Sequence, residues 1–155
     1  MPLKKLKEFL DNAGVKYIIV SHAPAYTAQE IAASAHIPGR ELAKTVMVKL
    51  DGKMAMAVLP ASYVVDFGRL KQTAGVSKAE LASEDEFRDL FPESEVGAMP
   101  PFGNLYDIPV YVESSLAEDE EIAFNAGSHK ELLRMAYKDF ISLVKPKAGG
   151  FGKLS

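Results

Sequence analysis

The sequence predicts a single α/β domain with a mixed sheet and peripheral helices. Helix-like and strand-like segments alternate along 155 residues with no linker or repeat between them. Two apolar runs flank Asp51-Gly52, a pair typical of β-hairpin turns. A hydrophobic content of 48% supports one ample core, whereas two domains would be cramped. We expect the domain to occupy residues 1–145.

The N-terminal segments are predicted from periodicity and helix-end signals. A first helix ends at Gly14, and residues 15–20 then form a strand. The sequence Thr27-Ala28-Gln29-Glu30 is a capping box that opens a short helix to about Ala35, before Pro38-Gly39 ends it. The apolar face of the first helix consists of Leu3, Leu6, Phe9 and Leu10.

The middle of the chain is predicted to form the hairpin and two helices. Residues 45–48 and 54–59 are the two apolar strands of the hairpin. A helix over 66–73 follows, with Gly75 at its exit. A second capping box, residues 83–86, opens a helix that Pro92 closes.

The C-terminal third is less regular. Residues 108–112 and 122–124 are predicted strands. The apolar spacing over 130–144 suits either one helix or a strand followed by a short helix. Residues 146–155 are rich in glycine, and we expect them to form a flexible tail.

Composition excludes several function classes. The chain has no cysteine, which rules out disulfides, thiolate zinc sites and cysteine nucleophiles. Its N-terminal residues mix charged and apolar side chains, unlike a signal peptide, and no apolar run is long enough to cross a bilayer. We therefore expect a soluble cytoplasmic protein that does not bind membranes.

Charge is unevenly distributed around the net value of −3. Residues 1–53 carry eight basic and five acidic side chains, a net charge of +3. Residues 54–144 carry seven basic and sixteen acidic ones, a net charge of −9, and the last eleven residues add +3. An acidic chain of this kind argues against tight, nonspecific nucleic-acid binding, and we expect no DNA partner. Brief contact with one RNA end at the basic flanks stays possible.

Lys44 is the first candidate functional residue. It is a lone cation directly before the apolar run 45–48, with Glu41 as the only acid close in sequence. A lysine at the entrance to a buried strand either extends its ammonium to solvent or holds an anion nearby.

The second candidate is the loop Gly97-Ala98-Met99-Pro100-Pro101-Phe102-Gly103. Its consecutive prolines remove two backbone donors and stiffen the chain, while its terminal glycines allow positive φ. The loop is either a rigid connector or a pocket wall whose amides bind a carbonyl or carboxyl oxygen. The available amides belong to Gly97, Ala98, Met99, Phe102 and Gly103.

The third candidate is Asn125-Ala126-Gly127-Ser128-His129, where small residues precede a histidine. His22 and His36 have no metal-ligand spacing with His129, so no metal site is predicted. A catalytic triad around Ser128 or Ser62 is rejected, because neither lies in a Gly-x-Ser-x-Gly elbow. No nucleotide-binding glycine loop is present either.

The order of these segments resembles a known family. The sequence His22-Ala23-Pro24-Ala25-Tyr26-Thr27 precedes Ala43-Lys44-Thr45, then Gly97–Pro101 with Phe102-Gly103, then Ala126–His129. This order is similar to the YbaK/ProX family of free-standing aminoacyl-tRNA deacylases, related to the editing insertion of bacterial prolyl-tRNA synthetase. The resemblance covers roughly residues 3–144. It implies a mostly antiparallel, barrel-like sheet and hydrolysis of the ester in mischarged aminoacyl-tRNA.

The resemblance also implies residue roles. Lys44 would hold the 3′ acceptor end of the tRNA. Lys44 and Gly97 would be the catalytic residues. Water, or a neighbouring group of the substrate, would attack the ester without a metal or other cofactor. An aminoacyl-tRNA synthetase is a further possible partner. The implied substrate-binding residues are Tyr26, Thr27, Ala98, Met99, Pro100, Pro101, Phe102, Gly103, Gly127, Ser128 and His129.

Three questions stay open in the sequence. The edited amino acid is undecided among alanine, cysteine, serine and threonine. An inactive tRNA- or synthetase-binding module of the same fold is one alternative, although the retained Lys44 and Gly97–Pro101 loop argue against it. A small-molecule esterase or amidase is the other.

Overall fold

The computed structural model describes residues 4–21, 41–95 and 97–154. Helix α1 (Lys4–Ala13) buries Leu6 and Leu10, and strand β1 (Tyr17–Ser21) follows it. Gly14 has φ +70° and donates its N–H to the Asp11 carbonyl at 3.1 Å, so the predicted helix end is confirmed. The capping box and short helix predicted within residues 27–39 lie outside the described residues.

The predicted hairpin is confirmed. Strands β2 (Ala43–Leu50) and β3 (Lys53–Pro60) pair antiparallel over their whole length. Asp51 and Gly52 have φ values of +51° and +81°, as a two-residue type I′ turn requires.

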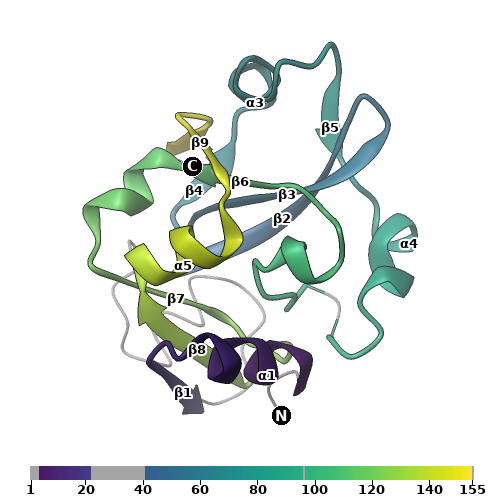
Figure 1. Cartoon of the computed structure of the whole chain (residues 1–155). Coiled ribbons are helices and arrows are strands. Elements are labelled where there is room, and N and C mark those ends of the chain that lie inside the picture. The colour runs from purple at the N-terminus through teal and green to yellow at the C-terminus, as the bar shows by residue number, and fades with distance from the viewer. Residues whose placement is uncertain (1–3, 22–40, 96, 155) are drawn as a thin grey trace.

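The hairpin is the centre of a five-stranded sheet, whose order is β5-β2-β3-β6-β9 (Figure 1). Strand β5 (Ala79–Leu81) pairs antiparallel with β2. Strand β6 (Val110–Glu113) lies parallel to β3, and β9 (Lys147–Gly149) lies parallel to β6. The predicted mixed sheet is therefore confirmed, and its two longest strands are antiparallel.

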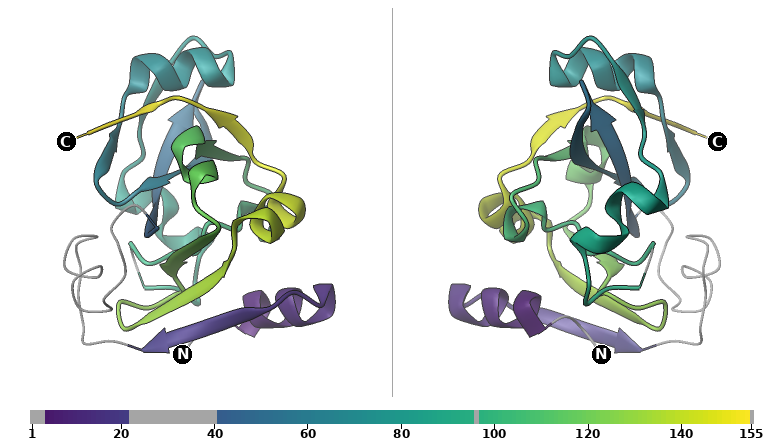
Figure 2. Two further views of the ribbon diagram at one scale, coloured as in Figure 1. Left: turned by 90° about the vertical axis from the view of Figure 1, so that its left-hand side faces the viewer. Right: turned by 90° about the vertical axis from the view of Figure 1, so that its right-hand side faces the viewer.

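A three-stranded antiparallel sheet, β1-β8-β7, forms the rest of the scaffold. It contains β7 (Glu121–Asn125) and β8 (Glu131–Ala136), and helix α5 (Tyr137–Val144) follows. The ambiguous segment 130–144 is thus a strand and then a helix. A parallel bridge between Leu42 and Ala123 connects this sheet to the start of β2. Figure 2 shows α1 beside this sheet, at the opposite end of the molecule from α3.

Helices α3 and α4 have the capping residues that their local sequences predict. Helix α3 (Phe67–Ala74) starts where Asp66 accepts the Arg69 N–H at 3.1 Å, and it ends at Gly75 in the left-handed conformation. Helix α4 (Glu84–Phe87) starts with the predicted capping box and continues as a short 3₁₀ turn, Arg88–Leu90. Two more 3₁₀ turns are Gly103–Leu105 and Ser114–Glu118.

The C-terminal residues differ from the flexible tail that the sequence predicts. They form β9 and β10 (Gly152–Leu154), and β10 pairs antiparallel with β4 (Tyr63–Val65). Phe151 between them is fully buried, and Gly152 donates its N–H to the buried Glu113 carboxylate at 3.3 Å. Burial of the Phe151 ring and the pairing of β9 and β10 with other strands order this segment, although its composition alone favours flexibility.

The core lies on both faces of the five-stranded sheet. One cluster includes Met47, Met99, Phe102, Phe124 and Phe140, which join the two sheets and α5. The other cluster includes Val48, Leu59, Leu70 and Phe151, under α3 and the C-terminal strands. Among the described residues no helix is long and apolar enough to cross a membrane.

Candidate functional site

Two irregular segments far apart in the sequence form one wall in the structure. They are the loop 97–103 and the turn 126–129, which joins β7 to β8. Gly127 donates its N–H to the Ala98 carbonyl at 3.0 Å, and Glu95 donates its N–H to the Gly127 carbonyl at 2.8 Å. Two of the three segments that the sequence analysis singled out are therefore hydrogen-bonded to each other.

Both segments depend on a glycine with positive φ. Gly97 has φ +86° and Gly127 has φ +98°, a region that costs other L-residues about 1–2 kcal/mol. A Cβ atom at Gly97 would lie 3.6 Å from Cε1 of His129, which is an ordinary contact distance. Gly97 is thus needed for its backbone conformation rather than for lack of space, and it lies beside the imidazole.

Some backbone N–H groups of the loop already donate hydrogen bonds within the protein. Ala98 donates to the Glu95 carbonyl at 3.0 Å, and Phe102 donates to the Pro100 carbonyl at 2.8 Å. The expectation that these two amides face a ligand is therefore wrong. Among the described residues, Gly97 donates to the thioether sulfur of Met99 alone, a weak acceptor, at 3.3 Å. For the N–H groups of Met99 and Gly103, the described part of the chain supplies no acceptor.

Most of the loop is buried, and its far end is fixed in the core. The Phe102 ring packs against Phe9, Phe124 and Phe140, with centroid distances of 6.2, 5.5 and 5.6 Å. A Cβ atom at Gly103 would lie only 2.3 Å from the Ile108 carbonyl oxygen, so this position requires glycine. Phe102 and Gly103 therefore anchor the loop. Their contact with the substrate stays a prediction. Gly97 itself is exposed.

The turn presents a buried histidine held by Glu95. His129 is 9% exposed, and its backbone N–H donates to Oε2 of Glu95 at 3.2 Å. Its Nε2 atom lies 3.9 Å from the same oxygen. Ser128 is also buried, and its hydroxyl oxygen accepts the Lys130 N–H at 3.3 Å. The Ser128 hydroxyl is therefore part of the turn.

The sequence analysis missed Glu95. It lies two residues before Gly97, in an acidic stretch with no motif, and its contact with His129 spans 34 residues of sequence. Only the fold brings this carboxylate to the turn.

Lys44 lies near the start of β2, opposite Leu59 in the register. Its side chain is half-buried, and this burial lowers the pKa of the ammonium below its ordinary value. Glu41, the acid nearest in sequence, pairs instead with Arg134 at 3.6 Å. No carboxylate of the described residues forms an ion pair with Lys44.

The structure does not join Lys44 to the wall by a polar contact. Ala43 and Met47 belong to the same core cluster as Met99. Val48 lies in the cluster on the other face of the sheet, and so does Leu59, which pairs with Lys44. Strand alternation therefore directs Lys44 away from the face that carries Met99. Tyr26 and Thr27, the remaining predicted site residues, lie outside the described residues.

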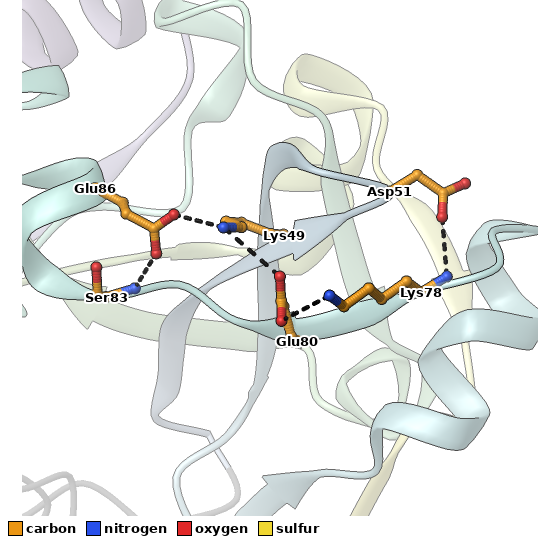
Figure 3. Close-up of polar contacts among 6 residues, drawn as sticks. All are labelled: Lys49, Asp51, Lys78, Glu80, Ser83 and Glu86. Carbon is orange, nitrogen blue, oxygen red and sulfur yellow. Dashed lines mark hydrogen bonds and ion pairs between the residues drawn. The ribbon is translucent and has the colours of Figure 1, made fainter.

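Charged side chains at the other end of β2 are paired with one another (Figure 3). Lys49 Nζ lies 2.6 Å from Glu86 and 3.6 Å from Glu80, and Lys78 lies 3.6 Å from Glu80. The hydrogen bond from Lys49, with a second from Ser83, lowers the pKa of Glu86 to about 2, and Glu86 raises the pKa of Lys49. We call Lys49, Lys78, Glu80 and Glu86 the β5 charge network, and it joins β2, β5 and α4.

Two further features of the described residues bear on the chemistry of the site. The described residues contain no group of three histidine or acidic side chains that could hold a metal ion, and metal-independent chemistry stays a prediction. A cleft of about 890 Å³ lies between the start of β1 and the end of β8. It has mixed charges, including Lys16, Arg134 and Asp139, and lies at the opposite end of the β7–β8 hairpin from the turn 126–129.

Solved structures share this fold. A hypothetical protein, APE2540, superposes with a TM-score of 0.86 over 97% of this chain and 100% of its own, at 20% identity. A candidate trans-editing enzyme for prolyl tRNA synthetase superposes with a TM-score of 0.81 over 97% of this chain and 96% of its own, at 19% identity. At these identities the likeness shows the fold alone.

Sequence relatives are longer proteins. The proline–tRNA ligase of Bacillus mycoides (strain KBAB4) is 28% identical over 89 residues, 57% of this chain and 16% of the ligase. That of Staphylococcus saprophyticus is 32% identical over 104 residues, 65% of this chain and 18% of the ligase. The chain matches less than a fifth of the length of either ligase. The model of the aminoacyl-tRNA editing domain matches residues 22–143, and this protein therefore belongs to the aminoacyl-tRNA editing domain family, as the order of its motifs predicted.

Proposed function

We propose that this protein is a free-standing hydrolase that cleaves the ester bond of mischarged aminoacyl-tRNA. One observation carries the proposal beyond family membership. The loop 97–103 and the turn 126–129 are hydrogen-bonded into one wall, on which Gly97, with its positive φ, lies beside His129. Such a wall can present backbone amides to an oxygen that gains charge during acyl transfer.

The reaction adds water across the ester. A water oxygen attacks the carbonyl carbon, and the carbonyl oxygen becomes an oxyanion. The bond to the ribose oxygen then breaks, releasing the amino acid and the 3′ end of the tRNA with its hydroxyl protonated. The N–H groups of Gly97 and Met99 are the candidates for binding the oxyanion, because Ala98 and Phe102 donate elsewhere and Gly103 is buried at the anchored end of the loop.

Lys44 is proposed to hold the RNA end through a phosphate. A half-buried ammonium that has lost hydration gains more from an anion than an exposed one does. Binding the RNA would fix the ester relative to the wall, so that positioning supplies a large part of the rate. Strand alternation directs Lys44 away from Met99, which is compatible with the RNA and the amino acid occupying separate parts of the site.

The amino-acid side of the site is proposed to act as a second sieve. A synthetase separates amino acids that differ by one methylene by only about 1–3 kcal/mol. A second pocket that admits the wrong product supplies the missing discrimination. Pro100 and Pro101 stiffen the loop, and Met99 and His129 are the candidates for setting the volume. Alanyl, cysteinyl, seryl and threonyl esters are the first substrates to test.

The proposed partner is the 3′ acceptor end of an aminoacyl-tRNA. The proposed location is the cytoplasm, because tRNA is charged there. A synthetase that makes the error, with prolyl-tRNA synthetase first because of the ligase relatives, is the proposed functional partner.

A deacylation screen tests the proposal. Alanyl, cysteinyl, seryl and threonyl esters of tRNA are each compared with the ethyl ester of the same amino acid. We expect at least one tRNA ester to be cleaved much faster than its ethyl ester. Equal rates would indicate a small-molecule esterase. Binding of tRNA without cleavage of any ester would indicate the inactive module.

A further inference from the structure

Glu95 occupies the junction of the two segments that form the wall. Its carbonyl accepts the Ala98 N–H of the loop at 3.0 Å, and its own N–H donates to Gly127 of the turn at 2.8 Å. Its backbone is therefore fixed from both sides. The carboxylate of this residue lies at the backbone N–H and the imidazole of His129.

The Glu95 carboxylate is only partly used by the protein. Oε2 accepts the His129 backbone N–H at 3.2 Å and lies 3.9 Å from the imidazole. No lysine or arginine of the described residues forms an ion pair with Glu95, and its side chain is 50% exposed. Glu41 and Glu86, in contrast, each pair with a basic side chain. Glu95 thus retains negative charge and acceptor capacity at the wall.

The proposed substrate carries a matching group. An amino acid esterified to tRNA keeps its α-ammonium, which is two bonds from the carbonyl carbon. A group that binds the ammonium must therefore lie within a few ångströms of the groups that bind the carbonyl oxygen. Glu95 is a candidate for this group, because its carboxylate contacts His129, and a Cβ atom at Gly97 would lie 3.6 Å from the same imidazole.

We propose that Glu95 binds the α-ammonium of the aminoacyl ester, so that the enzyme selects esters of α-amino acids over uncharged acyl esters. This inference rests on the proposed deacylase function. The carboxylate contacts the substrate directly, and through its hydrogen bond with the His129 backbone N–H it also holds the turn. A charge-assisted hydrogen bond of this kind is worth about 10- to 100-fold in kcat/KM.

Two substitutions separate the two roles. Glu95→Gln keeps an oxygen that can accept the His129 N–H and removes the negative charge. Glu95→Ala removes both. Glu93→Gln is the matched control, because Glu93 is an exposed acid two residues earlier, and its charge acts on Tyr106 instead, where it adds to the larger effect of burial in raising the pKa of that phenol.

The experiment pairs each variant with two substrates of nearly equal size. Alanyl-tRNA carries the α-ammonium, and lactyl-tRNA carries a hydroxyl in its place. We expect Glu95→Gln to lower kcat/KM for alanyl-tRNA by about 10- to 100-fold and to leave lactyl-tRNA within about twofold. Glu93→Gln should change neither. Glu95→Ala should slow both substrates, because His129 also loses its support. If another aminoacyl ester is the best substrate of the screen, that ester and its α-hydroxy counterpart replace the pair.

The outcomes distinguish this inference from the function on which it rests. Equal losses on alanyl- and lactyl-tRNA in Glu95→Gln would show that Glu95 only positions His129, and the deacylase function would stand. Unchanged rates in Glu95→Gln would also overturn the inference alone. If the wild-type protein cleaves no aminoacyl-tRNA, the function and the inference both fail. Circular dichroism and thermal unfolding of each variant identify any loss caused by misfolding.

Discussion

Lys44 and Lys49 lie on the same strand, yet the fold treats their charges in opposite ways. Lys49 is held by Glu86 and Glu80, and the hydrogen bond to Glu86 raises the pKa of its ammonium. Lys44 is half-buried, and burial alone lowers its pKa. A paired charge contributes to folding, whereas a desolvated cation that no carboxylate of the described residues pairs with keeps its capacity to bind an anion.

The neighbouring elements explain this difference. Strand β5 pairs with residues 48–50 and brings Glu80 beside Lys49, while α4 brings Glu86. Strand β5 does not extend to Lys44, and Glu41 is paired with Arg134. Within the described residues, acidic side chains therefore neutralise the lysine at one end of β2 and not the one at the other end, where we propose that an RNA phosphate binds.

Exchange of each lysine for alanine is the strongest test of this contrast. We expect Lys44→Ala to lower deacylation by more than about 100-fold and to change the free energy of unfolding by at most about 0.5 kcal/mol. Lys44→Arg should also impair turnover, because a planar guanidinium does not replace a compact ammonium. Lys49→Ala should lower the melting temperature and leave turnover unchanged. Steady-state kinetics and thermal unfolding measure both. Near-normal turnover in Lys44→Ala would remove this lysine from the site.

The next largest effect is expected at Gly97. Gly97→Ala should lower kcat/KM by about 100-fold, because the methyl group disfavours the φ of +86° that aims the neighbouring amides. Gly75→Ala is the matched control, since Gly75 has φ +70° at the end of α3 and an added methyl group meets nothing within 4 Å. Both variants should lose about 1–2 kcal/mol of stability. Wild-type turnover in Gly97→Ala would place the reacting ester elsewhere.

A smaller and more selective effect is expected at Met99 and His129. Met99→Phe and His129→Trp should change the ratio of kcat/KM between two mischarged tRNAs by about tenfold, because they reduce the volume of the proposed sieve. Lys44→Ala should lower both values alike, since it acts on the RNA. A uniform loss in the two enlarged variants would assign these side chains to core packing, and urea unfolding would then show a matching loss of stability.

The smallest effect concerns the β5 charge network in acid. The pKa of Glu86 is lowered from 4.5 to about 2, so its contribution to stability is fully present above pH 4.5 and is lost as the pH falls toward 2. Glu86→Gln should therefore flatten the decrease in stability over this range and leave deacylation at neutral pH unchanged. Urea unfolding between pH 7 and pH 2.5 tests this. An identical acid profile in the variant would show that Glu86 gains nothing from Lys49.

Much of the fold was predictable because its signals are local. The Asp51-Gly52 turn, the capping box at Ser83 and the glycine ends of α1 and α3 each depend on a few adjacent residues. The conformations of these residues are decided by sterics and hydrogen bonds within one turn of chain. The site segments at Gly97 and His129 were recognisable for the same reason, since their unusual composition is itself local.

Tertiary structure decided what depends on distant partners. Residues 131–136 become a strand because β1 and β7 pair with both edges, although their apolar spacing also suits a helix. The C-terminal residues become β9 and β10 because Phe151 and Glu113 hold them. The joining of the loop to the turn, and the position of Glu95 at His129, follow from hydrogen bonds across about 30 residues. The sequence by itself determined the family, the turns and the candidate segments. Which charges are neutralised within the protein was decided only when the sheets paired, because a charge is neutralised by neighbours in space.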